Sequence, residues 1–241
     1  MRLDKFLSNA TDFSRSEIKK LIKAGEVTVD GMSASGPNQQ VNEDSDICLY
    51  GNSVSQPTAR YFMLYKPDGY VSVTKDAEHP TAIDLLVDEP RSGELQIAGR
   101  LDLDATGLLL ITDDGQWNHA LTSPKSDCKK TYLVTLANPI SENDAEKIAR
   151  KFSEGVWLDN EKRRTLPAVL EMISGTEARL TIAEGKYHQV KRMFASQGNR
   201  VVTLHRERIG EIVLDADMEP GEYRALTEDE IDSVWNSGGG K

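Results

Sequence analysis

The stretch GRLDLDATGLLLIT, residues 99–112, joins a charged loop to an unbroken aliphatic segment. In its first half, charged residues alternate with leucines: Arg100, Leu101, Asp102, Leu103 and Asp104. If this half is extended, the charged side chains point to one side and the leucines anchor the other. The run over 107–112 is long enough for a buried strand, which would hold the loop rigidly. A catalytic carboxylate needs such rigidity.

The spacing of these residues alone leaves other interpretations open. An exposed turn with charged residues is the most ordinary one. An Asp-x-Asp metal site, as in metal-dependent glycosyltransferases, is another, although nothing nearby indicates a nucleotide-sugar domain. The choice between these and a catalytic loop has to come from the rest of the chain.

Strand-like segments, rich in β-branched, aromatic and aliphatic residues, dominate the sequence beyond residue 59. Strands are predicted at 61–65, 70–74, 107–112, 131–136, 168–173 and 178–183. Helices are predicted at 114–121, 141–153, 188–197 and 227–235. Because strands and helices do not alternate regularly, the predicted fold class is α+β, with a mixed or mostly antiparallel sheet flanked by helices.

The first 58 residues have a different pattern and predict a small helix-rich module. Ser14 and Glu17 fit a capping box that opens a helix. On that helix the basic residues recur every fourth position, at Arg15, Lys19 and Lys23. This stripe is either a solvated helix face or a surface for a polyanion.

Little apolar content over residues 51–59 predicts the linker between two domains. The predicted domains are therefore 1–58 and 60–235. Residues 236–241 (NSGGGK) are predicted to be a flexible tail.

The formal net charge of −10 argues against a nucleic-acid partner only until its distribution is considered. Residues 1–23 carry six basic and three acidic side chains, and residues 186–208 carry six basic and one acidic. Residues 215–232 hold eight acidic side chains against one arginine. Two basic islands remain, which favours a polyanionic partner.

Two cysteines outside any CxxC pair make a disulfide framework or a zinc site improbable. The N-terminus has no apolar signal region, and no run approaches the roughly 18 apolar residues of a membrane span. A cytoplasmic protein is expected, with no membrane association.

Four stretches in a fixed order resemble the motifs of the RsuA family of bacterial ribosomal-RNA pseudouridine synthases. They are RYFMLYKPDGY (60–70), GRLDLDATGLLLITDDG (99–115), KTYLV (130–134) and EGKYHQVKRMF (184–194). The N-terminal stretch 2–31, ending in VTVDG, resembles the S4-type RNA-binding module of these enzymes. The likeness covers nearly the whole chain and is closest to the enzymes that act on small-subunit (16S) rRNA.

This resemblance implies an S4-like domain followed by a pseudouridine synthase catalytic domain. The implied reaction breaks the C1′–N1 bond of one uridine, expected to be uridine 516 of 16S rRNA, turns the base and rejoins it through C5. It implies no cofactor and no metal. The implied partner is small-subunit rRNA, free or within an assembling ribonucleoprotein particle, and the protein is expected to be a monomer.

The resemblance also implies roles for single residues. Asp102 matches the essential aspartate, Tyr132 the tyrosine that stacks on the target base, and Lys191 the cation that pairs with the carboxylate. Because neighbouring positions on a helix point about 100° apart, only one of Lys191 and Arg192 should face the site. RNA contacts are expected from Arg100, Arg192, Arg15, Lys19, Lys23, Arg206 and Arg208. His188 and Gln189 are expected to cap or pack.

Two positions depart from the family pattern: Ala105, usually Ser or Thr, and Tyr65, commonly Asn. Neither removes a charged group, so altered local packing is expected. Two alternatives to a small-subunit enzyme stay open: a sister enzyme acting on large-subunit rRNA, and a non-catalytic RNA-binding assembly factor.

Overall fold

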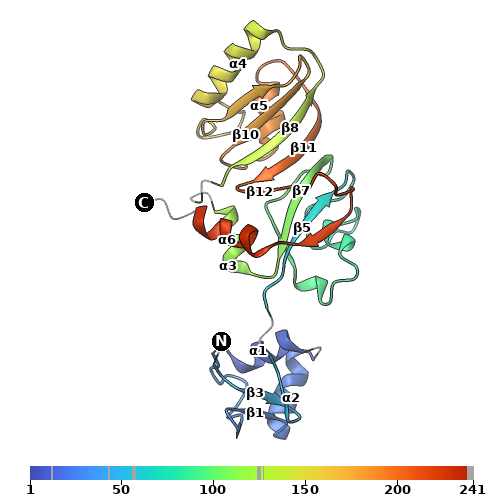
Figure 1. The fold of residues 1–241 in the computed structure, drawn as a ribbon, viewed down its shortest axis with the longest axis vertical. Coiled ribbons are helices and arrows are strands. Elements are labelled where there is room, and N and C mark those ends of the chain that lie inside the picture. The colour runs from blue at the N-terminus through green and yellow to red at the C-terminus, as the bar shows by residue number, and fades with distance from the viewer. Residues whose placement is uncertain (12, 43, 56–57, 124–125, 127, 238–241) are drawn as a thin grey trace. The chain divides into compact units, whose positions relative to one another are not determined.

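The computed structural model describes residues 1–11, 13–42, 44–55, 58–123, 126 and 128–237. It divides into two compact units, Met1–Ala59 and Arg60–Lys241, which we describe separately (Figure 1). In the part of the chain so described, no helix combines the length and the apolarity that crossing a membrane requires.

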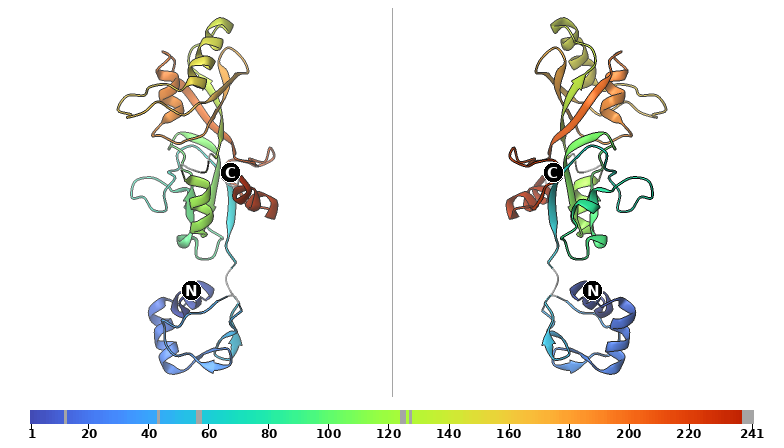
Figure 2. Two further views of the ribbon diagram at one scale, coloured as in Figure 1. Left: turned by 90° about the vertical axis from the view of Figure 1, so that its left-hand side faces the viewer. Right: turned by 90° about the vertical axis from the view of Figure 1, so that its right-hand side faces the viewer.

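The first unit packs two helices against a small antiparallel sheet. Its elements are α1 (Leu3–Ala10), α2 (Arg15–Ala24), β1 (Val27–Val29), β2 (Met32–Ser33), β3 (Ile47–Leu49) and β4 (Asn52–Ser53), with sheet order β2-β1-β3-β4. Figure 2 shows the two helices beside these short strands. Helices and strands share one core, in which Leu3, Ile18 and Ile47 are fully buried.

The predicted capping box at the start of α2 is confirmed. The Ser14 hydroxyl accepts from the Glu17 backbone N–H at 3.4 Å, and the Glu17 carboxylate accepts from the Ser14 N–H at 2.8 Å. The helix ends at Gly25, whose φ of 82° is readily adopted by glycine. Part of the predicted linker 51–59 belongs to the sheet as β4, and residues 56 and 57 lie outside the described residues.

The second unit is built on a sheet that is antiparallel except where β7 runs parallel to β11. Its strands are β5 (Tyr61–Lys66), β6 (Gln96–Ala98), β7 (Ala105–Thr112), β8 (Lys130–Leu136), β9 (Val169–Met172), β10 (Glu177–Ile182), β11 (Val201–Ile209), β12 (Ile212–Val213) and β13 (Tyr223–Ala225). The order is β13-β5-β7-β11-β8-β10-β9, with β6 paired to β7 and β12 to β11. The predicted α+β class with a mixed, mostly antiparallel sheet is confirmed.

Helices cover both faces of this sheet. They are α3 (Gly115–Thr122), α4 (Glu142–Glu154), α5 (Gln189–Ala195) and α6 (Glu228–Ser237), with short 3-10 helices at Ala82–Leu85 and Ser92–Glu94. Alternate residues of β7 enter two separate cores: Leu109 lies in the core that contains residues of α4 and α5, and Leu108 in the core that contains residues of α3 and α6. Burial on both faces explains why β7 is a continuous aliphatic run.

Two local predictions are wrong. Residues 70–74 form no strand, and only an isolated bridge joins Val71 to Thr81. This segment instead lies against the loop before β7, where the Ser72 hydroxyl accepts from the Leu101 backbone N–H at 3.1 Å. In addition, α6 continues through Ser237, so 236 and 237 of the predicted tail are helical. The other tail residues, 238–241, lie outside the described residues.

Candidate active site

The loop between β6 and β7 carries Asp102 at the edge of a cavity. Leu101 is buried, as predicted, but Leu103 is 39% exposed, because residues 103 and 104 form a turn rather than an extended segment. The prediction of one anchored leucine face is therefore correct only for Leu101. The carboxylate of Asp102 is 27% exposed, which leaves it accessible at a fixed position.

Two buried cations hold this loop by its carbonyl groups. The Lys66 ammonium, on a side chain with no solvent exposure, donates to the carbonyls of Leu103 at 3.1 Å and Ala105 at 2.7 Å. The Arg206 guanidinium donates to the carbonyls of Gly99 at 2.8 Å and Arg100 at 3.3 Å. The backbone on both sides of the aspartate is thereby fixed, and such support gives a functional side chain a defined position.

Lys66 was not identified as a site residue from the sequence, although it lies in the motif stretch 60–70. Burial lowers its pKa to about 8, against the opposing effect of nearby carboxylates, of which Asp68 has the largest influence and Asp104 and Asp102 follow. No local sequence signal indicates this burial, because a lysine at the end of a strand is ordinarily exposed to solvent.

Arg206 does not share an exposed basic face with Arg208, although the two residues stand at alternate positions of β11. Its side chain is 1% exposed, and its guanidinium also donates to the Leu108 carbonyl at 2.8 Å. The ladder between β11 and β8 shifts register between Arg206 and Arg208. Such a bulge breaks the two-residue alternation on which a common face depends. Arg208 is 42% exposed and pairs with Glu211.

Two side-chain nitrogens approach the Asp102 carboxylate. The Lys191 ammonium lies 3.4 Å from Oδ2, and the His188 Nε2 lies 3.5 Å from Oδ1. Lys191 is closer to the exposed Asp104, at 2.5 Å, and this hydrogen bond holds the pKa of Asp104 below its usual range. Sequence reasoning missed the approach of His188, because the left-handed backbone at this residue (φ 46°) gives no recognisable sequence signal.

Of the two neighbouring cations on α5, Lys191 faces the aspartate and Arg192 does not, as predicted. Arg192 forms an ion pair with Glu161 at 3.1 Å. It also donates to the carbonyl of Tyr187 at 3.0 Å and to that of Asp159. Arg192 therefore ties the loop before α5 to the segment after α4.

A cavity of about 470 Å³ opens beside these groups and is lined by Arg100, Asp102, Tyr132 and His188, among others. Tyr132, on β8, is 7% exposed, so its ring is held by packing while forming part of the cavity wall. A second cavity of about 560 Å³ shares Arg100 and Tyr132 as lining residues. Within the described residues, no group of three or more His, Cys, Asp or Glu side chains is arranged to hold a metal ion.

The other predicted RNA contacts are distributed over both units. Arg100 is exposed between the two cavities. In the first unit, Arg15, Lys19 and Lys23 are all exposed on α2. The arrangement can present phosphate-binding cations on the surface and an accessible carboxylate beside an aromatic wall.

An exposed basic helix face on a separate small unit and an accessible carboxylate at a cavity fit an enzyme that acts on a polyanion. Residues 60–196 match the family model described as RNA pseudouridylate synthase, and residues 1–47 match the S4 domain. The chain belongs to the RNA pseudouridylate synthase family, and it is a pseudouridine synthase, an isomerase. The resemblance stated from its motifs is confirmed.

Several known proteins are similar to this chain over nearly its full length. The ribosomal small subunit pseudouridine synthase A of Escherichia coli K12 is 54% identical over 235 residues, covering 97% of this chain and 100% of the relative. The protein of the same name from Vibrio cholerae is 53% identical, covering 98% and 100%. A crystal structure of a pseudouridylate synthase is 45% identical, with a TM-score of 0.68, covering 97% of this chain and 99% of the other.

Proposed function

We propose that this protein isomerises one uridine of 16S rRNA, uridine 516, to pseudouridine, with Asp102 as the catalytic carboxylate. The observation that carries the assignment is the position of Asp102 at a 470 Å³ cavity, where Lys191 and His188 approach its two oxygens and Tyr132 forms a wall. The substrate is inferred from relatives whose name states that they act on the ribosomal small subunit.

Asp102 serves each route by which the glycosidic bond of uridine is broken. The carboxylate attacks C1′, attacks the ring at C6, or removes a proton from the sugar, and all three need it ionised and positioned. The Lys191 ammonium lies 3.4 Å from Oδ2 of Asp102 and forms an ion pair with the carboxylate there.

Tyr132 provides the aromatic surface for the extruded uracil. Taking a base out of its stack costs a few kcal/mol, and a base–aromatic contact contributes about 1–3 kcal/mol in return. Arg100 is exposed at the border of both cavities and is proposed to hold a neighbouring phosphate or to occupy the space the base leaves, since a guanidinium both stacks and binds phosphate.

Residues 1–58 are proposed to bind the RNA through the exposed stripe of Arg15, Lys19 and Lys23 on α2. Arg208, which is 42% exposed, is proposed as a peripheral phosphate contact of the catalytic domain, residues 60–235. Arg192, with its guanidinium committed to Glu161 and two carbonyls, acts by holding the loop that carries Tyr187.

The test is release of tritium from C5 of uridine in unmodified small-subunit rRNA, offered free and in partly assembled particles. We expect wild type to release one label per RNA and Asp102→Asn to release none. Asp104→Asn is the matched control, because it removes a neighbouring, exposed carboxylate, and it should keep most of the activity. Mapping the modified base then tests uridine 516, and EDTA should have no effect.

Each other outcome points to a different function. If no small-subunit preparation releases tritium while RNA binding is intact, large-subunit rRNA is favoured as the substrate. If large-subunit rRNA releases no tritium either, a non-catalytic RNA-binding factor is favoured. Full activity in Asp102→Asn would remove this residue from the chemistry.

A further inference from the structure

Tyr187 places a large exposed aromatic ring in the wall of the cavity that holds Asp102. Its side chain is 76% exposed, although it lies in the same cavity lining as the buried Tyr132. A tyrosine that serves only the core would be buried, because aromatic burial is where such a residue contributes stability. The exposed ring therefore needs a different explanation.

The ring of Tyr187 continues a line of groups that begins at the catalytic carboxylate. It stacks on the imidazole of His188, with 3.8 Å between the ring centroids and 21° between the planes. That imidazole in turn lies 3.5 Å from the Asp102 carboxylate. In space, His188 therefore lies between the Asp102 carboxylate and the ring of Tyr187.

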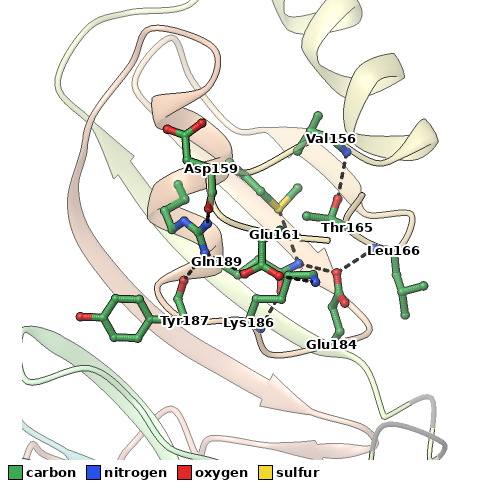
Figure 3. A network of polar contacts seen from close by, with 11 residues as sticks. Val156, Asp159, Glu161, Thr165, Leu166, Glu184, Lys186, Tyr187 and Gln189 are labelled. Atoms are coloured by element: carbon green, nitrogen blue, oxygen red, sulfur yellow. Dashed lines mark hydrogen bonds and ion pairs between the residues drawn. The ribbon is translucent and has the colours of Figure 1, made fainter. Parts of the chain in front are cut away.

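The backbone on both sides of Tyr187 is fixed by polar contacts (Figure 3). Its carbonyl accepts from Arg192 at 3.0 Å, and Arg192 is paired with Glu161. Glu161 also accepts from the Lys186 ammonium at 2.8 Å, and these hydrogen bonds from Lys186 and Arg192 hold its pKa below the usual range.

Lys186 is held a second time through its backbone. Its N–H donates to the Gln189 side chain at 2.9 Å. In Figure 3 the ring of Tyr187 points away from this network. The backbone that carries the Tyr187 ring is therefore held in place before any ligand binds, which reduces the entropy lost on binding.

We propose that Tyr187, backed by His188, forms a stacking subsite for an unpaired nucleobase next to the target uridine. The proposal rests on the proposed function. Extruding a uridine unstacks the bases on either side of it. An exposed, fixed aromatic ring beside the cavity offers one of these neighbours a new stacking partner, as single-stranded RNA recognition requires.

The first test compares steady-state tritium release by the full-length protein and by Tyr187 variants on small-subunit RNA. Tyr187→Ala should raise KM about tenfold, which corresponds to ~1.4 kcal/mol of binding free energy, and should leave kcat within about twofold. Tyr187→Trp should keep the wild-type KM. Trp235→Ala is the control, because it removes an aromatic ring that is 45% exposed on α6, and it should change neither constant.

The second test removes the other partner of the stack. An abasic residue is placed at the 5′ or the 3′ neighbour of the target, and each RNA is assayed with wild type and Tyr187→Ala. At one of the two positions, the abasic residue should raise the KM of wild type by about the same factor as Tyr187→Ala does. It should not raise the KM of the Tyr187→Ala variant any further. A purely structural role for Tyr187 would make the two losses multiply.

The outcomes separate this subsite from the enzyme function. If wild type is active and Tyr187→Ala has an unchanged KM, or if the losses multiply at both positions, the subsite is refuted and the function stands. If wild type releases no tritium from small-subunit RNA, the proposed function fails, and the subsite fails with it.

Discussion

Replacing Lys66 by methionine removes the ammonium that holds the loop of Asp102 while filling nearly the same space. Lys66 has no solvent exposure, and its Nζ donates to the carbonyls of Pro67 at 2.9 Å, Leu103 at 3.1 Å and Ala105 at 2.7 Å. Methionine has no donor for any of these carbonyls. The bond to Ala105 is buried, so no water takes the place of the lost donor there.

The expected loss of stability follows from two opposing contributions. Each of the three lost bonds to the ammonium is worth ~1.5–3 kcal/mol. Against this, burial lowers the pKa of Lys66 from 10.5 to about 8, so removing the buried charge returns ~3 kcal/mol at ~1.36 kcal/mol per pKa unit. We expect Lys66→Met to lower the free energy of unfolding by about 3 kcal/mol at pH 7.

The difference between the two proteins should also depend on pH. The pKa of Lys66 is lower in the folded protein than in the unfolded chain, so the unfolded chain binds more protons between pH 8 and pH 10.5. The contribution of this residue to stability is therefore constant below pH 8 and rises as the pH passes through that window. The variant lacks this contribution, so its deficit should grow by up to ~3 kcal/mol.

Urea unfolding followed by tryptophan fluorescence measures both effects. The signal reports on the catalytic unit alone, because its tryptophans are Trp117, Trp157 and Trp235 and the first unit has none. Lys75→Met, at an exposed lysine, is the control and should change stability by less than ~0.5 kcal/mol. A Lys66→Met protein as stable as wild type at pH 7, with a pH-independent difference, would refute this account of the loop.

Three further predictions concern other parts of the molecule. Gly107→Ala should cost ~2–4 kcal/mol in thermal unfolding, because φ is +102° and a Cβ would lie 2.4 Å from the Arg206 carbonyl oxygen; an unchanged melting temperature would contradict the close approach of β7 and β11. Ser14→Ala should lower the stability of α2 by ~1 kcal/mol in amide hydrogen exchange, through loss of its cap. Lys191→Met should raise the pKa of Asp104 in a carboxyl NMR titration, because the Lys191 hydrogen bond keeps that pKa low; a downward or absent shift would disprove the pairing.

Much of the site could be predicted because its residues lie in short local motifs. Asp102, Tyr132 and Lys191 were each identified from a stretch of a few residues. In the structure, Asp102 and Tyr132 line one cavity, and Lys191 lies 3.4 Å from Asp102. The burial of β7 could also be predicted from its aliphatic run, because a strand buried on both faces is apolar along its length.

Features that depend on pairing across the sheet could not be predicted. Arg208 does not share a face with the buried Arg206, because the ladder between β11 and β8 shifts register between them, and no local pattern reveals that shift. The approach of His188 to Asp102 depends on one left-handed backbone position and on the neighbouring loop. Residues 70–74 have strand-like composition, yet they pack as a loop in which the Ser72 hydroxyl accepts from the Leu101 backbone N–H, a contact between segments distant in the sequence.

The hydrogen bond from Arg206 to the loop of Asp102 affects the order in which the two units fold during synthesis. The core of Met1–Ala59 is made from its own residues, so this unit can close once it has left the ribosome, and domains generally fold in that order. The loop of Asp102 has to wait for Arg206, which bonds to Gly99 across 107 residues. A nascent chain therefore has a complete S4 domain long before it has a site, and can hold RNA, under the proposed function, before it can modify it.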